Sequence, residues 1–268
     1  WPERLAAEFH DVEVGIARTC AAYGGAPEVR EVEALFVEHI ARARRFVYAE
    51  SQYFASRRIA EAIALRLLEP DPPEFVIVTP LTADGWLAQA TMDIARVRLI
   101  HALNDRDHAG RFYIYTPLTT GGEGIYVHAK LMIVDDEVLR VGSANMNNRS
   151  MGLDTEADVV LDALRPGNEH IVPAISRLRL MLLAEHCGVS VDAIADLLEE
   201  NGSMAKVIAL LQGEGKRLAP FVLRPLTDAE KAMADSALFD PERPEELFEP
   251  MGRRRGLFRR GGILRRPR

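Results

Sequence analysis

A histidine, a lysine and an aspartate stand at a fixed spacing in the middle of the sequence, as His128-x-Lys130-x4-Asp135. In a chain of this composition the spacing is expected about 0.006 times by chance. Apolar residues surround the pair from position 125 to 134, which predicts a buried strand. Residues two apart on a strand leave the same face, so His128 and Lys130 should line a cavity near the strand end rather than face bulk solvent.

A second group of polar residues, Gly142-Ser143-x-Asn145, follows the next predicted strand. It can bring a hydroxyl, an amide and backbone N–H groups to the same place. A histidine with a lysine and neutral donors suits a phosphate ester, because imidazole can attack phosphorus while lysine and asparagine hold the non-bridging oxygens. The segment lacks the cysteine or further acidic ligands of a zinc site, so no metal or cofactor is expected.

Three polar residues of this segment can each be interpreted in two ways. Asp135 can take part in the chemistry or only fix the backbone of a hairpin turn, and we favour the structural role. Ser143 can contact the substrate or only close a turn. Glu156 can support the histidine as a second partner, which we favour, or simply stand at a strand edge. The other six histidines lack such neighbours and are predicted to lie on the surface or on helix faces.

The elements that position these residues are predicted from hydrophobic periodicity and from turn residues. Strand and helix alternate with short connections up to position 124, which indicates an α/β layered domain with a partly parallel sheet. A hairpin follows, with its turn at Asp135-Asp136, and the chain then becomes helical. Strands are expected at 12–17, 46–50, 75–78, 112–115, 125–134, 137–141 and 157–161, helices at 31–45, 57–68, 87–103, 173–187, 191–199, 204–211 and 228–239, and loops at 18–27 and 116–124.

Composition narrows the classes of protein that the chain can belong to. Hydrophobic residues make up 48% and charged residues 27% of the 268 positions, which is typical of a globular protein. Eight of the 33 basic residues and none of the 40 acidic residues lie in 251–268, so residues 1–250 carry a formal charge of −15. Such a body disfavours nucleic acid as a partner. The two cysteines, Cys20 and Cys187, are expected to be free thiols, and no apolar stretch is long enough for a membrane-spanning helix.

The segment 128–145 matches the H-x-K-x4-D-x6-G-S-x-N signature of the phospholipase D superfamily, which the chain resembles from about Val12 to Leu161. The segment 46–54, which contains Glu50 and Gln52, resembles the strand and Glu-x-Gln-Tyr-Phe element that opens the C-terminal half of bacterial phospholipase D-like proteins. The resemblance implies a phospholipase D-like α/β sandwich lobe, with a mixed sheet flanked by helices. We expect this lobe over residues 1–240, with a helical C-terminal portion, and a disordered Pro/Arg-rich tail over 241–268.

The resemblance also implies roles for individual residues. In this family one histidine forms a phosphohistidine and a histidine of a second motif protonates the leaving alcohol. It implies catalytic roles for His128 and Lys130, with Asp135 grouped with them, and a substrate-binding role for Asn145. The remaining members of the implied site are Ser143 and Gln52 as substrate-binding residues and Gly142, Glu156 and Glu50 as supporting residues.

The chain has one such motif where an active family member has two. The second motif is expected either from a second copy of the chain or from an N-terminal half that precedes Trp1, and the absence of an initial methionine favours the second. The isolated chain should then have negligible activity. The predicted function is hydrolysis or exchange of a phosphodiester of a membrane phospholipid, and the alternatives are a homodimeric nuclease of the same superfamily and a non-catalytic binding lobe.

The arginine-rich tail, residues 251–268, alternates basic clusters with apolar residues. It can adsorb to anionic lipid headgroups, which we favour because the predicted substrate is there. It can also be a disordered solubilising tail or the flank of a membrane segment. The predicted location is therefore cytoplasmic, with peripheral attachment at the inner face of the membrane.

Overall fold

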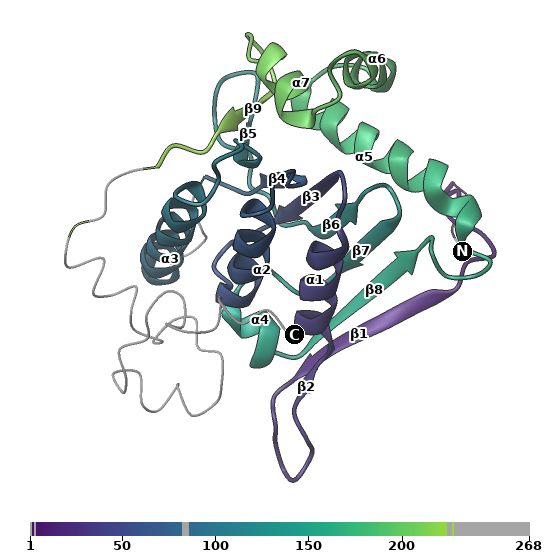
Figure 1. Cartoon of the computed structure of the whole chain (residues 1–268), viewed down its shortest axis with the longest axis vertical. Helices are drawn as coiled ribbons and strands as arrows, with labels where there is room; N and C mark the ends of the chain where they lie inside the picture. The colour runs from purple at the N-terminus through teal and green to yellow at the C-terminus, as the bar shows by residue number, and fades with distance from the viewer. Residues whose placement is uncertain (1, 3, 82–85, 224–226, 228–268) are drawn as a thin grey trace.

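The computed structural model describes residues 2, 4–81, 86–223 and 227. Across these residues, strands join in one mixed nine-stranded sheet in the order β2-β1-β8-β7-β6-β3-β4-β5-β9 (Figure 1). The strands are β1 (Val14–Cys20), β2 (Val29–Arg30), β3 (Phe46–Ser51), β4 (Glu74–Val78), β5 (Phe112–Leu118), β6 (Lys130–Val134), β7 (Val138–Gly142), β8 (Glu156–Asp162) and β9 (Arg217–Pro220).

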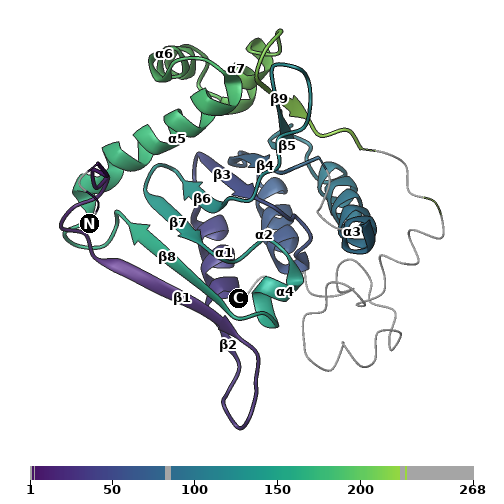
Figure 2. The same ribbon diagram turned by 180° about the vertical axis from the view of Figure 1, so that it is seen from behind.

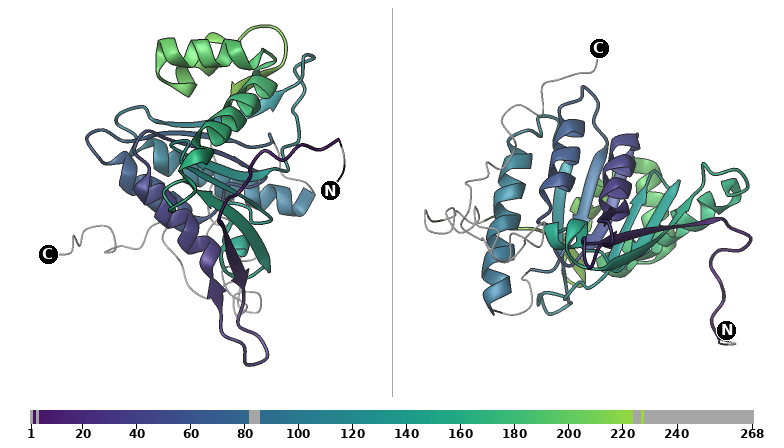
Figure 3. Two further views of the ribbon diagram at one scale, coloured as in Figure 1. Left: turned by 90° about the vertical axis from the view of Figure 1, so that its right-hand side faces the viewer. Right: turned by 90° about the horizontal axis from the view of Figure 1, so that it is seen from below.

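Helices cover both faces of this sheet, as the two views of Figure 3 show. One face carries α1, α2 and α3, and the other carries α5 with α6 and α7 at its end. The helices are α1 (Glu31–Arg42), α2 (Arg57–Leu67), α3 (Trp86–Asn104), α4 (Asn148–Gly152), the 3₁₀ turn η1 (Glu169–Ile171), α5 (Val172–Cys187), α6 (Val191–Asn201) and α7 (Met204–Leu210). Among the helices in this part of the chain, none combines the length and apolarity that crossing a bilayer needs.

The sheet has a parallel half and an antiparallel half. Strands β3, β4 and β5 are parallel neighbours, and α2 and α3 make the crossovers between them. Strands β6, β7, β8 and β1 are antiparallel neighbours. The β6–β7 hairpin turns at Asp135 and Asp136, whose φ angles of 56° and 62° are left-handed, as a tight hairpin turn requires.

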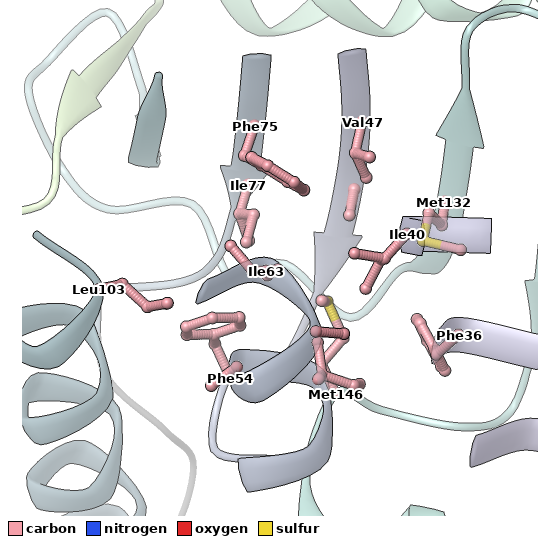
Figure 4. Packing of buried hydrophobic residues seen from close by; sticks show 14 of the residues in the cluster. Phe36, Ile40, Val47, Phe54, Ile63, Phe75, Ile77, Leu103, Met132 and Met146 are labelled. Carbon is pink, nitrogen blue, oxygen red and sulfur yellow. The ribbon is translucent and has the colours of Figure 1, made fainter. Parts of the chain in front are cut away.

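The core lies in two layers because β3 is buried on both faces. Val47 and Ala49 point toward α1 and α2, whereas Phe46 and Tyr48 point toward α5. Figure 4 shows the first layer, where side chains from the helices interdigitate with those of the central strands. The central strands and the two helical layers therefore form a rigid platform for the residues at the strand ends.

The predicted α/β fold class with a mixed, helix-flanked sheet is confirmed. Several boundaries were wrong. Strand β1 continues through Cys20, because residues 14–19 pair along β8. Strand β5 continues to Leu118, because β9, which periodicity missed, pairs with its end. The short β2 was also missed. The predicted helix at 228–239 and the predicted tail at 241–268 lie outside the described residues.

Candidate active site

Apart from Asp135, the motif residues lie at one edge of the sheet, where β3 ends and β6 begins. Lys130, the first residue of β6, pairs with Ser51, the last residue of β3. Strand β7 ends at the same edge, because Val141 pairs with Leu131 and Gly142 is the last residue of β7. The antiparallel hairpin thus returns the Gly142–Asn145 turn to the start of β6, as the sequence predicts.

The segment that follows β3 is tied to this turn by backbone contacts. The Ser51 hydroxyl accepts a hydrogen bond from the Met146 N–H at 3.0 Å. The Met146 carbonyl accepts from the N–H groups of Ala55 and Ser56, at 2.8 and 2.9 Å. The two sequence segments that carry the family resemblance, 46–54 and 128–145, therefore meet at one edge.

Lys130 is half-buried and points its ammonium group at two oxygen acceptors. Its Nζ donates to the side-chain oxygen of Gln52 at 3.3 Å and to the backbone carbonyl of His128 at 2.8 Å. Burial lowers the pKa of Lys130, Glu156 opposes that shift through its charge, and Arg140 adds to it. The edge thus holds a partly desolvated cation, which suits a phosphate oxygen better than a fully hydrated one would.

His128 differs from its prediction in two ways. It is exposed, and it precedes β6 rather than lying on it. The physical reason is that β3 ends at Ser51, so residues 125–129 have no strand partner on that side. The expectation that His128 lines a cavity within this chain was therefore wrong. Its imidazole stacks on the ring of Tyr126, with the ring centroids 6.4 Å apart and the planes inclined by 16°.

Gly142 stands where no other residue fits. A Cβ atom at this position would lie 2.6 Å from the Asp158 Cα and closer still to its carboxylate. That carboxylate is held by the buried guanidinium of Arg140, whose Nε donates to it at 2.7 Å. Arg140 also donates to the Ala144 carbonyl at 2.6 Å, and the Ala144 N–H donates to Asp158 at 3.1 Å. One buried ion pair therefore shapes the turn that carries Ser143 and Asn145.

The polar residues of the turn have different surroundings. The Ser143 hydroxyl donates to Glu156 and accepts from the Ala157 N–H at 3.1 Å, so Glu156 lies at this edge as a direct partner of Ser143. Asn145 is held through its backbone N–H, which donates to the Ser150 hydroxyl at 3.1 Å. The side-chain oxygen of Asn145 is buried and has no hydrogen-bond partner among the described residues. An amide oxygen only accepts hydrogen bonds, so a phosphate oxygen could be bound only by the Nδ2 group of Asn145.

Asp135 lies at the opposite end of β6, five residues or about 17 Å along the strand from Lys130. Its buried carboxylate accepts hydrogen bonds at 2.7 to 2.8 Å from the backbone N–H groups of Arg44, Arg45 and Phe46. The structure therefore does not bring Asp135 to the edge that holds His128. Its contacts are those of a residue that joins the end of α1 and the start of β3 to the hairpin.

Of the two candidate residues at the end of β3, Gln52 lies beside Lys130, whereas Glu50 lies away from it. Gln52 is buried, and its side-chain oxygen accepts a hydrogen bond from Lys130. Glu50 is buried on the α5 side of β3, where it accepts from the Tyr48 hydroxyl at 2.6 Å and pairs with the His186 Nε2 at 3.0 Å. His186 of α5 thus has a buried acidic partner, which was not expected, while His39, buried on α1, lies on a helix face as predicted.

Reasoning from the sequence missed the residues that support the motif. The Arg140–Asp158 pair joins positions 18 residues apart, and neither residue belongs to the motif. Tyr126 was detectable, because it lies two residues before His128 and period-two spacing places both side chains on one side. Both cysteines are free, as expected. The described residues contain no group of three or more histidine, cysteine or acidic side chains placed to hold a metal ion.

Two protein-family models match the part of the chain that contains these residues. The chain matches the family model described as cardiolipin synthase, PLD-like domain, over residues 36–171, and the model described as phospholipase D over residues 117–232. It is 28% identical over 221 residues to phospholipase D from Phytophthora infestans, covering 64% of this chain and 12% of that protein. It is 27% identical over 233 residues to phospholipase D alpha 3 from Arabidopsis thaliana, covering 61% of this chain and 28% of that protein. The matched region thus spans less than a third of these relatives.

Among solved structures, the chain is similar to phosphatidylserine synthase from Haemophilus influenzae Rd KW20, with 16% identity and a TM-score of 0.48 over 73% of this chain and 46% of that one. A phospholipase D family member from Salmonella typhimurium, Nuc, gives 15% identity and a TM-score of 0.42 over 61% of this chain and 91% of that one. The family relationship rests on the PLD-like domain model, which spans half of the chain and includes the whole segment from His128 to Asn145. The chain belongs to the phospholipase D superfamily.

Proposed function

We propose that this chain is one lobe of a phosphodiesterase or phosphatidyltransferase that acts on membrane phospholipids through a phosphohistidine on His128. The observation that carries the proposal is the single sheet edge that carries the exposed His128, the half-buried Lys130 and the turn with Asn145. Membership of the phospholipase D superfamily supports the same chemistry. The aligned part of the relatives is short, so the activity of the whole protein belongs to the proposal.

The proposed reaction has two displacements. The imidazole of His128 attacks phosphorus, a P–N bond forms, and the P–O bond to the leaving alcohol breaks while an acid protonates that oxygen. Water or a second alcohol then attacks the phosphohistidine, gives up its proton to the same group, and restores the imidazole. The Lys130 ammonium and the Asn145 side-chain amide would bind non-bridging oxygens, whose charge builds up in each transition state.

The acid must come from a second motif, because the sequence contains H-x-K once. An apolar sheet surface beside the edge favours a second motif-bearing lobe as its source. Ile16, Val159 and Val141 are successive cross-strand partners on β1, β8 and β7, and each is at least 44% exposed on the face that α5 only partly covers (Figure 2). Contiguous exposed apolar side chains on one sheet face are typical of a protein–protein contact surface. An Ile16→Glu variant should therefore weaken assembly with that lobe, measured by sedimentation velocity, whereas unchanged assembly would count against this surface.

The test of the function is replacement of His128 in the intact protein. His128→Ala should abolish headgroup release from phosphatidylcholine vesicles and acid-labile labelling by a phosphorus-labelled lipid. His108→Ala, which changes an exposed histidine in the turn before β5, serves as the matched control and should leave both unchanged. Headgroup release that survives His128→Ala refutes the catalytic proposal. Cleavage of DNA rather than lipid would favour the nuclease alternative, which the charge of −15 on residues 1–250 disfavours.

We further propose that residues 251–268, which lie outside the described residues, attach the protein to the inner face of the membrane. Eight arginines, each contributing about 1 kcal/mol near an anionic surface, are the basis of this proposal. Sedimentation with anionic vesicles should fall sharply when these residues are removed, and it should also fall with rising salt. Equal sedimentation of the full and truncated chains would refute the attachment.

A further inference from the structure

Tyr126 links the two motif residues that the proposed reaction needs most. Its ring stacks on the His128 imidazole at a centroid distance of 6.4 Å. Its hydroxyl oxygen accepts a hydrogen bond from the Gln52 Nε2 at 2.6 Å. The Tyr126 side chain is 46% exposed, so burial of its own surface explains little of its placement. The Tyr126 ring is therefore held by His128 at its face and by Gln52 at its hydroxyl group.

Gln52 extends this link to the lysine. Its side-chain oxygen accepts from the Lys130 Nζ at 3.3 Å. Its Nε2 donates to the hydroxyl of Tyr53 at 3.0 Å as well as to that of Tyr126. Both amide hydrogens and the amide oxygen are therefore used, and this pattern sets the orientation of the amide, because reversing it would point the NH₂ group at a lysine that can only donate.

His128 has few other constraints. Residues 125–129 precede β6 and make no ladder with β3. No hydrogen bond holds the imidazole of His128 within the described part of the chain, whereas the stack on Tyr126 orients its plane. A nucleophile must be held close to its attack geometry, because small misplacements cost large factors in rate.

We propose that Tyr126 is a positioning residue that sets the imidazole plane of His128 and, through Gln52, the place of the Lys130 ammonium. The inference rests on the proposed function, in which His128 is the nucleophile. Stacking and the hydrogen bond act on different atoms of Tyr126, so they can be removed one at a time. Phenylalanine keeps the stack and loses the link to Gln52, whereas leucine loses both.

The test compares Tyr126→Phe and Tyr126→Leu in the intact protein with Tyr23→Phe, which changes an exposed tyrosine in the β1–β2 loop. We expect kcat to fall about fivefold for Tyr126→Phe and about thirtyfold for Tyr126→Leu, with KM within about twofold, the factors that a lost hydrogen bond and a lost aromatic contact give. The control should keep its kcat. Partial recovery by phenylalanine distinguishes positioning of the histidine from a general need for bulk.

A double-mutant cycle tests the link through Gln52. If Tyr126 acts on Lys130 through this amide, then adding Tyr126→Phe to Gln52→Met should lower kcat by less than about twofold more. Additive losses would refute the link, and an unchanged kcat in both Tyr126 variants would refute the positioning role. A lower melting temperature with unchanged kcat per folded molecule would assign Tyr126 to stability alone. His128→Ala separates the two failures, because it tests the proposed function without touching Tyr126.

Discussion

Replacement of Gly142 by alanine tests whether the buried Arg140–Asp158 ion pair shapes the turn of the candidate site. The added methyl group would lie 2.6 Å from the Asp158 Cα, and backbone cannot yield as a flexible side chain can. The carboxylate that it meets is also fixed, because Asp158 and Arg140 are both buried and paired with each other. The clash can be relieved only by separating β7 from β8 or by pushing Asp158 away from Arg140.

The loss of stability expected for Gly142→Ala follows from these two ways of relieving the clash. Forcing an extra methyl group into a packed site costs about 1–3 kcal/mol. Breaking a buried ion pair costs about 3–5 kcal/mol, because a charge is left buried without its partner. We therefore expect the free energy of unfolding to fall by at least about 3 kcal/mol, a large part of the 5–15 kcal/mol that is typical of a domain.

Urea denaturation followed by far-UV circular dichroism measures this loss. Gly213→Ala is the matched control, because a Cβ at Gly213 meets no atom within 4 Å, and its stability should change by less than about 0.5 kcal/mol. Activity of the folded Gly142→Ala protein should also fall, since the turn that carries Ser143 and Asn145 must move. If the two variants differ by less than about 1 kcal/mol, the reasoning about the buried pair is refuted.

Three further predictions concern single side chains. Burial lowers the pKa of Lys130, so its ammonium loses its proton at a lower pH than an ordinary lysine does, and activity should decline as the pH rises through that lowered pKa; a Lys130→Arg variant, charged throughout, should lose this alkaline decline, and its persistence in the pH–rate profile would assign it to another group. Asp135→Ala should lower the free energy of unfolding by about 3 kcal/mol, because three backbone N–H groups lose their acceptor, while kcat per folded molecule stays the same; a specific loss of kcat would show instead that Asp135 serves the chemistry. His186→Ala should lower the free energy of unfolding by about 2 kcal/mol, because Glu50 stays buried with one hydrogen-bond donor fewer. A melting temperature no lower than that of His101→Ala, which changes an exposed histidine, would contradict this.

Local sequence determined the elements whose signals are short-range. Helices α2 and α5 to α7 follow from apolar spacing and from serine or glycine at their ends, as Ser56, Gly188 and Gly202 show. The β6–β7 hairpin follows from Asp135-Asp136 between two apolar runs. The spacing of His128, Lys130 and Asn145 was sufficient to identify the family, because such a spacing is rare in random sequence.

Tertiary structure alone decided the pairings between distant residues. Strand β9 forms because β5 offers it a free edge about 100 residues earlier, and no local pattern in residues 217–220 reports that. The same holds for Glu50, which a helix 136 residues away supplies with His186. Periodicity gives the face of an element but not the partner that the face meets, so these contacts could not be read in advance.

In the candidate site, too, some features follow from the sequence and others only from the tertiary structure. The sequence by itself pointed to the residues that are proposed to carry the chemistry, because the proposed function constrains residue type and spacing along one short segment and the turn that follows. Only the tertiary structure decided that His128 is exposed, that Tyr126 contacts His128 while Gln52 contacts Lys130, and that Asp135 lies at the far end of β6. The reason is that orientation and exposure depend on where strand pairing stops, and here pairing stops at Ser51, before it reaches the histidine.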